Sequence, residues 1–150
     1  MATHYQGTEK EAAALNAYIA LMRASESLAS RLTPSIDAAK LTWSQFGVLE
    51  MLHHLGPLAQ CDIAKRLLRS GGNVTMVVDN LEKRGLVSRE RNAEDRRSVT
   101  VTISPEGTKI IKAAFKSHLE ALANEFSILS SEELGTLRKI CKVLGLQKRE

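Results

Sequence analysis

The stretch that most constrains the fold is residues 58–107, where two short helical patterns are followed at once by two strand patterns. Apolar residues recur at helical spacing on both sides of Gly71-Gly72, and Gly85 is a typical helix end. The runs LVSRERN and SVTVTIS then alternate apolar and polar residues, which predicts a β-hairpin with a charged tip. The predicted inward residues of the two helices are Ile63, Ala64, Leu67 and Leu68, then Val74, Val77, Val78 and Leu81. The sequence therefore predicts a helix-turn-helix with a β-wing directly after it.

A long helix and a shorter one are predicted before this middle region. Apolar residues recur every three, four or seven positions over residues 8–33. Pro34 is expected to stop that helix, because the residue before a proline is pushed out of the α region. The next helix is predicted over residues 42–55, with Thr42 as its N-cap and Gly56-Pro57 as its end.

Two further helices are predicted after the hairpin. Ser104 and Pro105 suit a helix cap and a first helical position, and they start a long helix. Residues 130–146 form the last helix, with apolar residues at heptad-like spacing. The outer helices carry more apolar stripe than one small core can cover. This favours packing between two chains over the alternative that these helices complete a single core.

Composition limits the class of protein. The 150 residues suffice for one domain with a core, and 21 Lys and Arg against 17 Asp and Glu leave a charge of +4, which mildly favours a polyanionic partner. Two cysteines cannot build a disulfide framework, so we expect both thiols to be reduced and to lie in the fold as small apolar groups. Signal-peptide and membrane-span patterns are missing, so a cytoplasmic protein with no membrane partner is expected.

The second helix of a helix-turn-helix fits the DNA major groove, where its outward side chains meet base edges. The predicted outward set is Asn73, Thr75, Met76, Asp79, Asn80 and Lys83. The two asparagines suit adenine edges, and the threonine and methionine suit thymine methyl groups. Ser70 is the expected cap of this helix, and backbone N–H groups at Ser70, Gly71 and Gly72 can approach a phosphate. The alternative is that the glycines only make a tight turn and the asparagines are solvated.

The predicted hairpin tip carries adjacent charges of both signs. Arg97 is the candidate minor-groove residue, because arginine meets enhanced negative potential in a narrow minor groove. Asp95 lies two residues earlier on the same side of an extended segment, so its carboxylate can orient the Arg97 guanidinium. Arg96 contacts either DNA or solvent. The alternative is a solvated tip whose ion pairs contribute about 0 to 1 kcal/mol. A phosphate-facing rim is predicted for Arg69, Lys83, Arg84, Arg89 and Arg91.

The region from residue 41 to residue 107 resembles the core of the multiple-antibiotic-resistance regulator (MarR) family. The resemblance rests on the Asp95-x-Arg97 wing, the LEKRGLVSR run and the TISPEG helix entry, while the flanking helices agree in length and order. It implies a dimeric repressor that binds a palindromic operator, with recognition helices in major grooves and wings in minor grooves. Arg97 would be the wing arginine, Asp95 its orienting partner and Arg96 a tip contact. Met76 stands where many members carry a basic residue, so their base preference does not transfer.

The predicted fold class is therefore mainly α with a small β-hairpin, a winged helix-turn-helix flanked by N- and C-terminal dimerisation helices. Residues 1–150 form a single subunit, with 41–103 as the DNA-binding region and 8–40 and 104–150 as the dimerisation region. Members of the family are commonly released by small phenolic or lipophilic acids, and some by cysteine oxidation. Candidate residues for such a pocket, each equally compatible with core packing, are Tyr18, Met22, Trp43, Phe46, His53 and Phe115.

Four alternative functions are compared with this one. Cys61 lies near a predicted helix start and could sense oxidation, although oxidation-sensing members carry their cysteine in the first helix. Adjacent His53 and His54 point about 100° apart on a helix, so neither a metal nor a cofactor is expected. No phosphate loop, HExxH or nucleophile elbow is present, so an enzyme is not expected. A winged helix that binds protein remains open. The favoured function is a dimeric, sequence-specific transcriptional regulator, a repressor released by an aromatic or lipophilic ligand.

Overall fold

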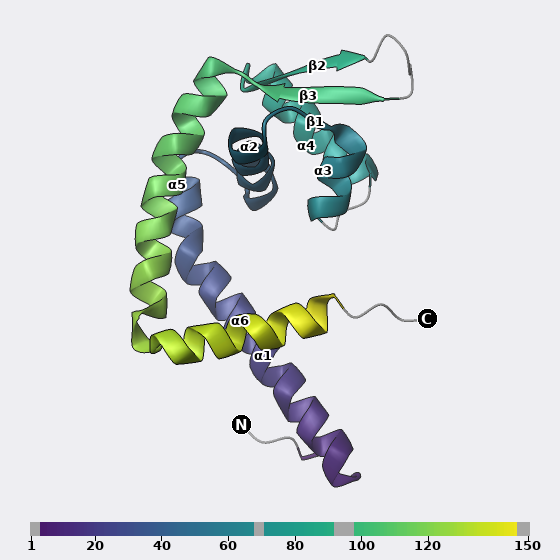
Figure 1. The fold of residues 1–150 in the computed structure, drawn as a ribbon, viewed down its shortest axis with the longest axis vertical. Helices are drawn as coiled ribbons and strands as arrows, with labels where there is room; N and C mark the ends of the chain where they lie inside the picture. Colours follow the sequence, from purple (N-terminus) through teal and green to yellow (C-terminus); the bar gives the residue numbers. More distant parts are fainter. Residues whose placement is uncertain (1–3, 68–70, 92–97, 147–150) are drawn as a thin grey trace.

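The computed structural model describes residues 4–67, 71–91 and 98–146. Its helices are α1 (Glu9–Asp37), α2 (Trp43–Leu55), α3 (Gln60–Leu67), α4 (Gly71–Lys83), α5 (Pro105–Glu125) and α6 (Ser131–Gly145), with a 3-10 turn, η1 (Phe126–Ile128), before α6. Its strands are β1 (Leu58–Ala59), β2 (Val87–Arg91) and β3 (Val99–Ile103). Figure 1 shows α2, α3, α4 and the sheet gathered at one end, with α1 and α5 extending away from them. The predicted helical fold with a winged helix-turn-helix is confirmed.

Helix α1 begins where the sequence predicts and ends later. The Thr8 hydroxyl accepts a hydrogen bond from the Glu11 N–H, and the Glu11 carboxylate accepts one from the Thr8 N–H, which forms a capping box. The helix continues through Pro34 to Asp37, so the prediction that Pro34 stops it was wrong. Ile36 is fully buried in the core. Burial of this last turn offsets the backbone hydrogen bond that a proline removes.

The predicted caps of α2 and α5 are confirmed. The Thr42 hydroxyl accepts from the Gln45 N–H, and the Gln45 side chain accepts from the Thr42 N–H. Gly56 follows α2 with a φ of 80°, in the region that favours glycine. The Ser104 hydroxyl accepts from the Gly107 N–H at the start of α5. The Ser104 cap sets where the wing joins α5.

The core lies between α2, α3, α4 and the sheet, and the end of α1 and the first half of α5 contribute to it. Val74, Val78 and Leu81 of α4 are fully buried, and Val77 packs against them from the edge of the core. The inward set predicted for α4 is therefore confirmed. Because one side of α4 is anchored this way, its opposite side is held outward. The other fully buried large side chains are Ile36, Val48, Leu49, Leu52, Ile63, Leu86, Val101 and Ile111.

The sheet contains one strand more than the sequence predicts. Strands β2 and β3 form the predicted antiparallel hairpin, in a register that runs from Val87 opposite Ile103 to Arg91 opposite Val99. Strand β1 pairs with the other side of β3, which gives the order β1-β3-β2. Two residues show no alternation, so β1 could not be recognised from its pattern. Its pairing attaches the hairpin to the start of α3.

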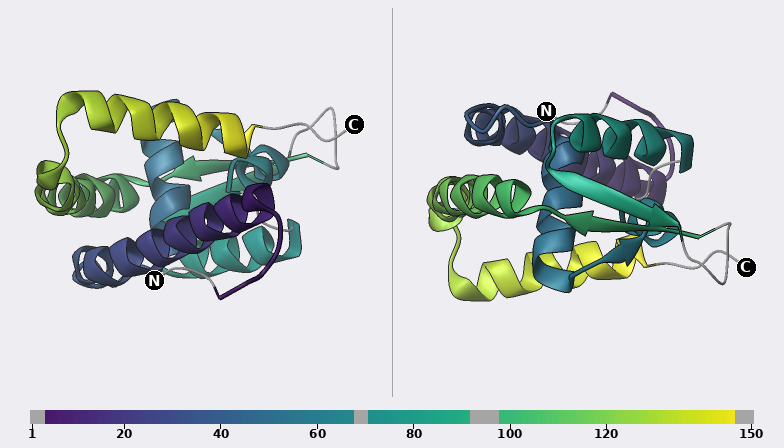
Figure 2. Two further views of the ribbon diagram at one scale, coloured as in Figure 1. Left: turned by 90° about the horizontal axis from the view of Figure 1, so that it is seen from below. Right: turned by 90° about the horizontal axis from the view of Figure 1, so that it is seen from above.

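The outer helices leave much of their apolar surface uncovered. Helix α6 has no buried residue. Its exposed large apolar side chains are Leu134, Leu137, Ile140, Val143 and Leu144, and α1 likewise exposes Tyr18, Leu21 and Met22. Figure 2 places α6 and the first half of α1 on opposite sides of the molecule, so neither covers the other. These surfaces agree with the expectation that one small core cannot cover all the helical stripes.

Both cysteines are exposed, which corrects the expectation that they lie within the fold. Cys61 is in the first turn of α3, and Cys141 is on α6, where no residue is buried. Because no residue of α6 is buried in the single chain, the Cys141 thiol is exposed together with the rest of that helix. Across the described residues, no helix combines the length and apolarity that a membrane crossing requires.

Candidate nucleic-acid interface

Helix α4 presents an exposed side away from the core. Thr75, Met76, Asn80 and Lys83 are exposed, while Asn73 and Asp79 are partly covered. Met76 is 58% exposed, so its thioether is accessible on this side of the helix. The side combines amide, hydroxyl, thioether and ammonium groups, the types that meet base edges and phosphates in a major groove.

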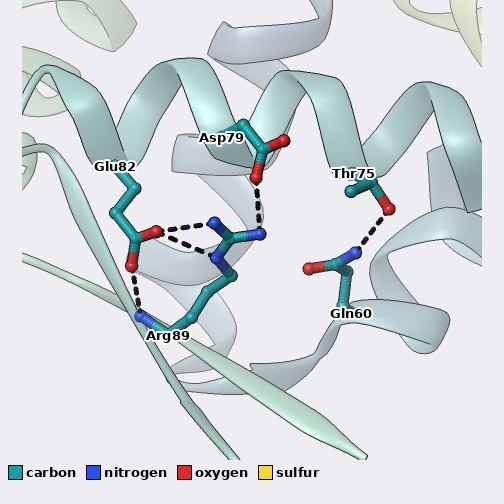
Figure 3. Close-up of polar contacts among 5 residues, drawn as sticks. All are labelled: Gln60, Thr75, Asp79, Glu82 and Arg89. Carbon is teal, nitrogen blue, oxygen red and sulfur yellow. Dashed lines mark hydrogen bonds and ion pairs between the residues drawn. The ribbon is translucent and has the colours of Figure 1, made fainter.

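Gln60, which was not among the predicted site residues, forms a hydrogen bond with Thr75 of α4. The amide Nε2 of Gln60, the first residue of α3, donates to the Thr75 hydroxyl oxygen at 2.8 Å (Figure 3). The other amide atom, Oε1, is buried and has no hydrogen-bond partner within the described residues. Gln60 thus ties the start of α3 to the second turn of α4. The contact spans fifteen residues, and no local pattern marks it.

The predicted basic rim is only partly available to DNA. Arg89 of β2 is engaged with two carboxylates of α4: its Nη1 lies 2.6 Å from Asp79 Oδ1 and its Nη2 lies 2.7 Å from Glu82 Oε2 (Figure 3). Arg84 donates from Nη1 to the Lys40 carbonyl oxygen at 2.8 Å. Both guanidinium groups therefore make contacts within the chain, although Arg84 is still exposed to solvent. Lys83 and Arg91 are exposed.

The contacts between Arg89 and Glu82 favour the charged form of both side chains. The hydrogen bonds from Arg89 lower the pKa of the Glu82 carboxyl, although burial partly opposes that effect. The same hydrogen bonds with Glu82 raise the pKa of Arg89. Both groups therefore stay charged at neutral pH. The outward set predicted for α4 included Asp79 but not Glu82, because sequence alone does not show which carboxylate faces β2.

Several predicted DNA contacts lie outside the described residues. They are Arg69, Ser70, Asp95, Arg96 and Arg97, so the predicted wing geometry and the cap of α4 stay predictions. Gly71 and Gly72 open α4. The strands that lead to residues 92–97 are in place, with Arg91 paired to Val99 at the end of the hairpin ladder.

Aromatic rings gather where α1, α2 and α5 meet. The imidazole of His118 lies 5.5 Å from the Trp43 ring and 5.1 Å from the Phe46 ring, between centroids and edge-on in both cases. Ser35 Oγ is 3.0 Å from His118 Nδ1. The indole N–H of Trp43 donates to Thr33 Oγ1 at 3.0 Å, which ties α2 to α1. His118 was missed as a candidate for the effector pocket, and burial lowers its pKa so that the neutral imidazole is favoured.

The six predicted ligand residues do not form one site within the chain. Trp43 and Phe46 share the His118 cluster. Phe115 contacts His54, which in turn contacts His53, at centroid distances of 5.0 and 4.9 Å. Tyr18 and Met22 are on the exposed half of α1, and Tyr18 lies fifteen residues before Thr33, or about 22 Å along a helix axis. Any pocket that includes all six therefore requires a second chain.

Metal binding and thiol oxidation were the other chemistries considered for the described residues. No group of three His, Cys, Asp or Glu side chains is placed to hold a metal ion within residues 4–67, 71–91 and 98–146. Cys61 is exposed, with its sulfur 4.0 Å from Asp62 Oδ1. Redox sensing by this thiol stays an alternative that these observations do not test.

A helix-turn-helix with an outward recognition side, followed directly by a β-wing, defines the class of winged helix-turn-helix DNA-binding proteins. A MarR family model matches residues 41–99. The HTH-type transcriptional regulator MhqR of Bacillus subtilis (strain 168) is 31% identical over 143 residues, which cover 95% of this chain and 97% of that protein. The chain belongs to the MarR family of transcriptional regulators, which are DNA-binding proteins and not enzymes.

Two solved structures share the fold over most of the chain. NadR, in complex with 4-hydroxyphenylacetate, is 24% identical with a TM-score of 0.75, and the match covers 99% of this chain and all of that one. BpsR of Bordetella bronchiseptica, whose DNA binding is regulated by 6-hydroxynicotinic acid, is 24% identical with a TM-score of 0.79. That match covers 87% of this chain and 98% of BpsR.

Proposed function

We propose that this regulator binds a palindromic DNA operator as a homodimer, with the exposed side of α4 in the major groove of each half-site. The observation that carries the proposal is the division of α4 into a fully buried side and an exposed side of base- and phosphate-contacting types. Asn80 and Met76 would meet base edges, whereas Lys83 and Arg91 would meet phosphates. The backbone at Gly71 and Gly72, where α4 begins, would approach a phosphate, because a helix N-terminus favours anions.

The uncovered surfaces of α1 and α6 support the homodimer. Leu137, Ile140 and Leu144 lie on one side of α6 at spacings of three and four residues. Burying such a stripe against a second copy would stabilise the dimer by about 25 cal/mol for each Å² of apolar surface removed from water. A two-fold dimer would place two α4 helices on successive turns of one DNA face, which is why the operator is expected to be palindromic.

The wing would complete each half-site. Arg97 would enter the minor groove, with Asp95 orienting its guanidinium and Arg96 at the tip, because a thin hairpin can carry arginine into a narrow groove. The β2–β3 pairing supports this role, since it ends at Arg91 and Val99, directly before and just after the tip.

The proposal extends to a repressor that a small aromatic acid releases from DNA. The ligand class is supported by the fold shared with NadR, solved in complex with 4-hydroxyphenylacetate, and with BpsR, whose DNA binding is regulated by 6-hydroxynicotinic acid. The cluster of Trp43, Phe46 and His118 supports its place, because aromatic walls with a few polar groups are typical of ligand sites. Tyr18 and Met22 would contribute from the partner chain.

One experiment tests the DNA-binding proposal. Operator duplexes are selected from random DNA with the wild-type protein, and affinities are then measured for Asn80→Ala, Lys83→Ala and Arg97→Ala. Each variant should lose about 1 to 3 kcal/mol of binding free energy while remaining a dimer. Asn80→Ala should relax base preference at one position, whereas Lys83→Ala should weaken all sequences equally and lower the salt slope by about one. Lys10→Ala, at the far end of α1, is the control that should bind as wild type does.

The same duplex tests the effector. Adding 4-hydroxyphenylacetate or 6-hydroxynicotinate should release the wild-type protein, and Trp43→Ala should raise the concentration that is required. Absence of sequence-preferring duplex binding at low salt would contradict the proposed function. Release by neither acid would contradict only the ligand class.

A further inference from the structure

The recognition helix carries two acidic side chains on the side that adjoins the wing. Asp79 and Glu82 lie one helical turn apart on α4, and their side chains are 40% and 38% exposed. DNA phosphates flank both edges of a major groove, so an unneutralised carboxylate near them repels the duplex. An α4 helix placed in the groove would bring both carboxylates toward this negative surface.

Arg89 compensates both charges from a single position. Its Nη1 lies 2.6 Å from Asp79, and Nη2 and Nε lie 2.7 and 3.0 Å from one oxygen of Glu82. The backbone N–H of Arg89 donates to the other Glu82 oxygen at 3.0 Å. Figure 3 shows the guanidinium between the two acids, with the side chain rising from β2. An arginine can do this because its planar group has five donors, whereas a lysine ammonium acts as a single point charge.

The surroundings of this cluster indicate which neighbouring cation remains available to DNA. A surface hollow between the end of α4 and the hairpin is lined by Glu82, Arg89, Arg91 and Val99. Arg91, two residues along β2, is exposed, and no ion pair to it is present among the described residues. The strand therefore provides one arginine that is used within the chain and one that is exposed beside it.

We propose that Arg89 makes the recognition helix compatible with DNA by masking the carboxylates of Asp79 and Glu82. It is a positioning residue that acts through these two acids, not a phosphate contact. This inference rests on the proposed placement of α4 in the major groove. It reassigns an arginine that charge alone would place among the phosphate-binding residues.

The test compares operator affinity among variants that separate charge from geometry. Arg89→Met should weaken binding to the selected duplex by roughly ten- to hundredfold, the size of a lost specific contact. Arg89→Lys keeps the positive charge but loses the fork that reaches both acids, so its affinity should fall between those of wild type and Arg89→Met. In the triple variant Asp79→Asn/Glu82→Gln/Arg89→Met the carboxylates are gone, and affinity should return to within about threefold of Asp79→Asn/Glu82→Gln.

The control is Arg91→Met, made both in the wild-type chain and in the Asp79→Asn/Glu82→Gln variant. Arg91 would contact phosphate directly, so removing the acids should not restore the affinity that this variant loses. Thermal unfolding and size-exclusion chromatography of every variant report whether the dimer and the fold survive. Because the single and triple Arg89 variants share the same methionine, recovery between them cannot come from the lost packing.

Two results would overturn the inference. One is an Arg89→Met protein that binds the duplex as tightly as wild type. The other is a triple variant, folded and dimeric, that binds no better than Arg89→Met. Failure of the wild-type protein to select any duplex would instead contradict the proposed function itself, so the two failures are distinguishable.

Discussion

Replacing Gly107 with alanine should disturb the joint between the wing and α5. Gly107 is buried in the first turn of α5, where its N–H donates to the capping hydroxyl of Ser104. A Cβ at this position would lie 2.2 Å from the Leu86 carbonyl oxygen and 2.9 Å from Ile103 Cγ1. The same Leu86 oxygen accepts from the Ser104 N–H at 2.9 Å. A backbone oxygen that is already hydrogen-bonded cannot move aside without weakening the joint.

The size of the effect follows from two opposing contributions. Overpacking a tight site costs about 1 to 3 kcal/mol, and a contact of 2.2 Å with a backbone atom places this variant at the upper end. Alanine in a helix is favoured over glycine by about 0.5 to 1 kcal/mol, which offsets part of that cost. The net expectation is a loss of about 2 kcal/mol in the free energy of unfolding.

Gly135 provides a matched control. It is also helical, on the exposed α6, and a Cβ there would have no atom within 4 Å. Gly135→Ala should therefore stabilise the protein by about 0.5 to 1 kcal/mol through the helix preference alone. Urea unfolding at a single protein concentration, followed by circular dichroism, measures both variants. If Gly107→Ala proves as stable as Gly135→Ala, the close approach of α5 to the Leu86 carbonyl is wrong.

Two further predictions concern pH and assembly. Burial lowers the pKa of His118 from its ordinary 6.5, so protons bind the unfolded chain preferentially. Stability should be full above about pH 6.5 and fall as the pH drops toward the folded pKa, and His118→Asn should flatten this dependence in urea midpoints, with His4→Gln as the control. Leu137→Asp on the apolar side of α6 should shift the protein from dimer to monomer in sedimentation, whereas Lys139→Asp, about 200° away around the helix, should not. Monomeric wild-type protein would contradict the proposed dimer, and an unchanged pH slope would contradict the buried histidine.

Much of the fold could be predicted because its signals are local. The caps at Thr42 and Ser104 act within three residues, and the β2–β3 hairpin and the inward side of α4 show their own periodicity. Strand β1 was not predictable, since two residues carry no period. The helix end expected at Pro34 was wrong because the burial of Ile36, a tertiary effect, keeps the helix intact beyond the proline.

The candidate site divides in the same way. Sequence alone determined that α4 has an outward side and that a hairpin follows it, because helix periodicity and turn chemistry are encoded over a few neighbouring residues. Only the tertiary structure decided which of the polar and charged side chains bind partners within the chain. Arg84 reaches a carbonyl 44 residues away, Gln60 reaches Thr75 across fifteen, and Arg89 joins β2 to α4. From sequence alone Arg84 and Arg89 belong to the phosphate-facing rim, and Gln60 has no assigned role. Folding brings each of them a partner that no spacing rule reveals.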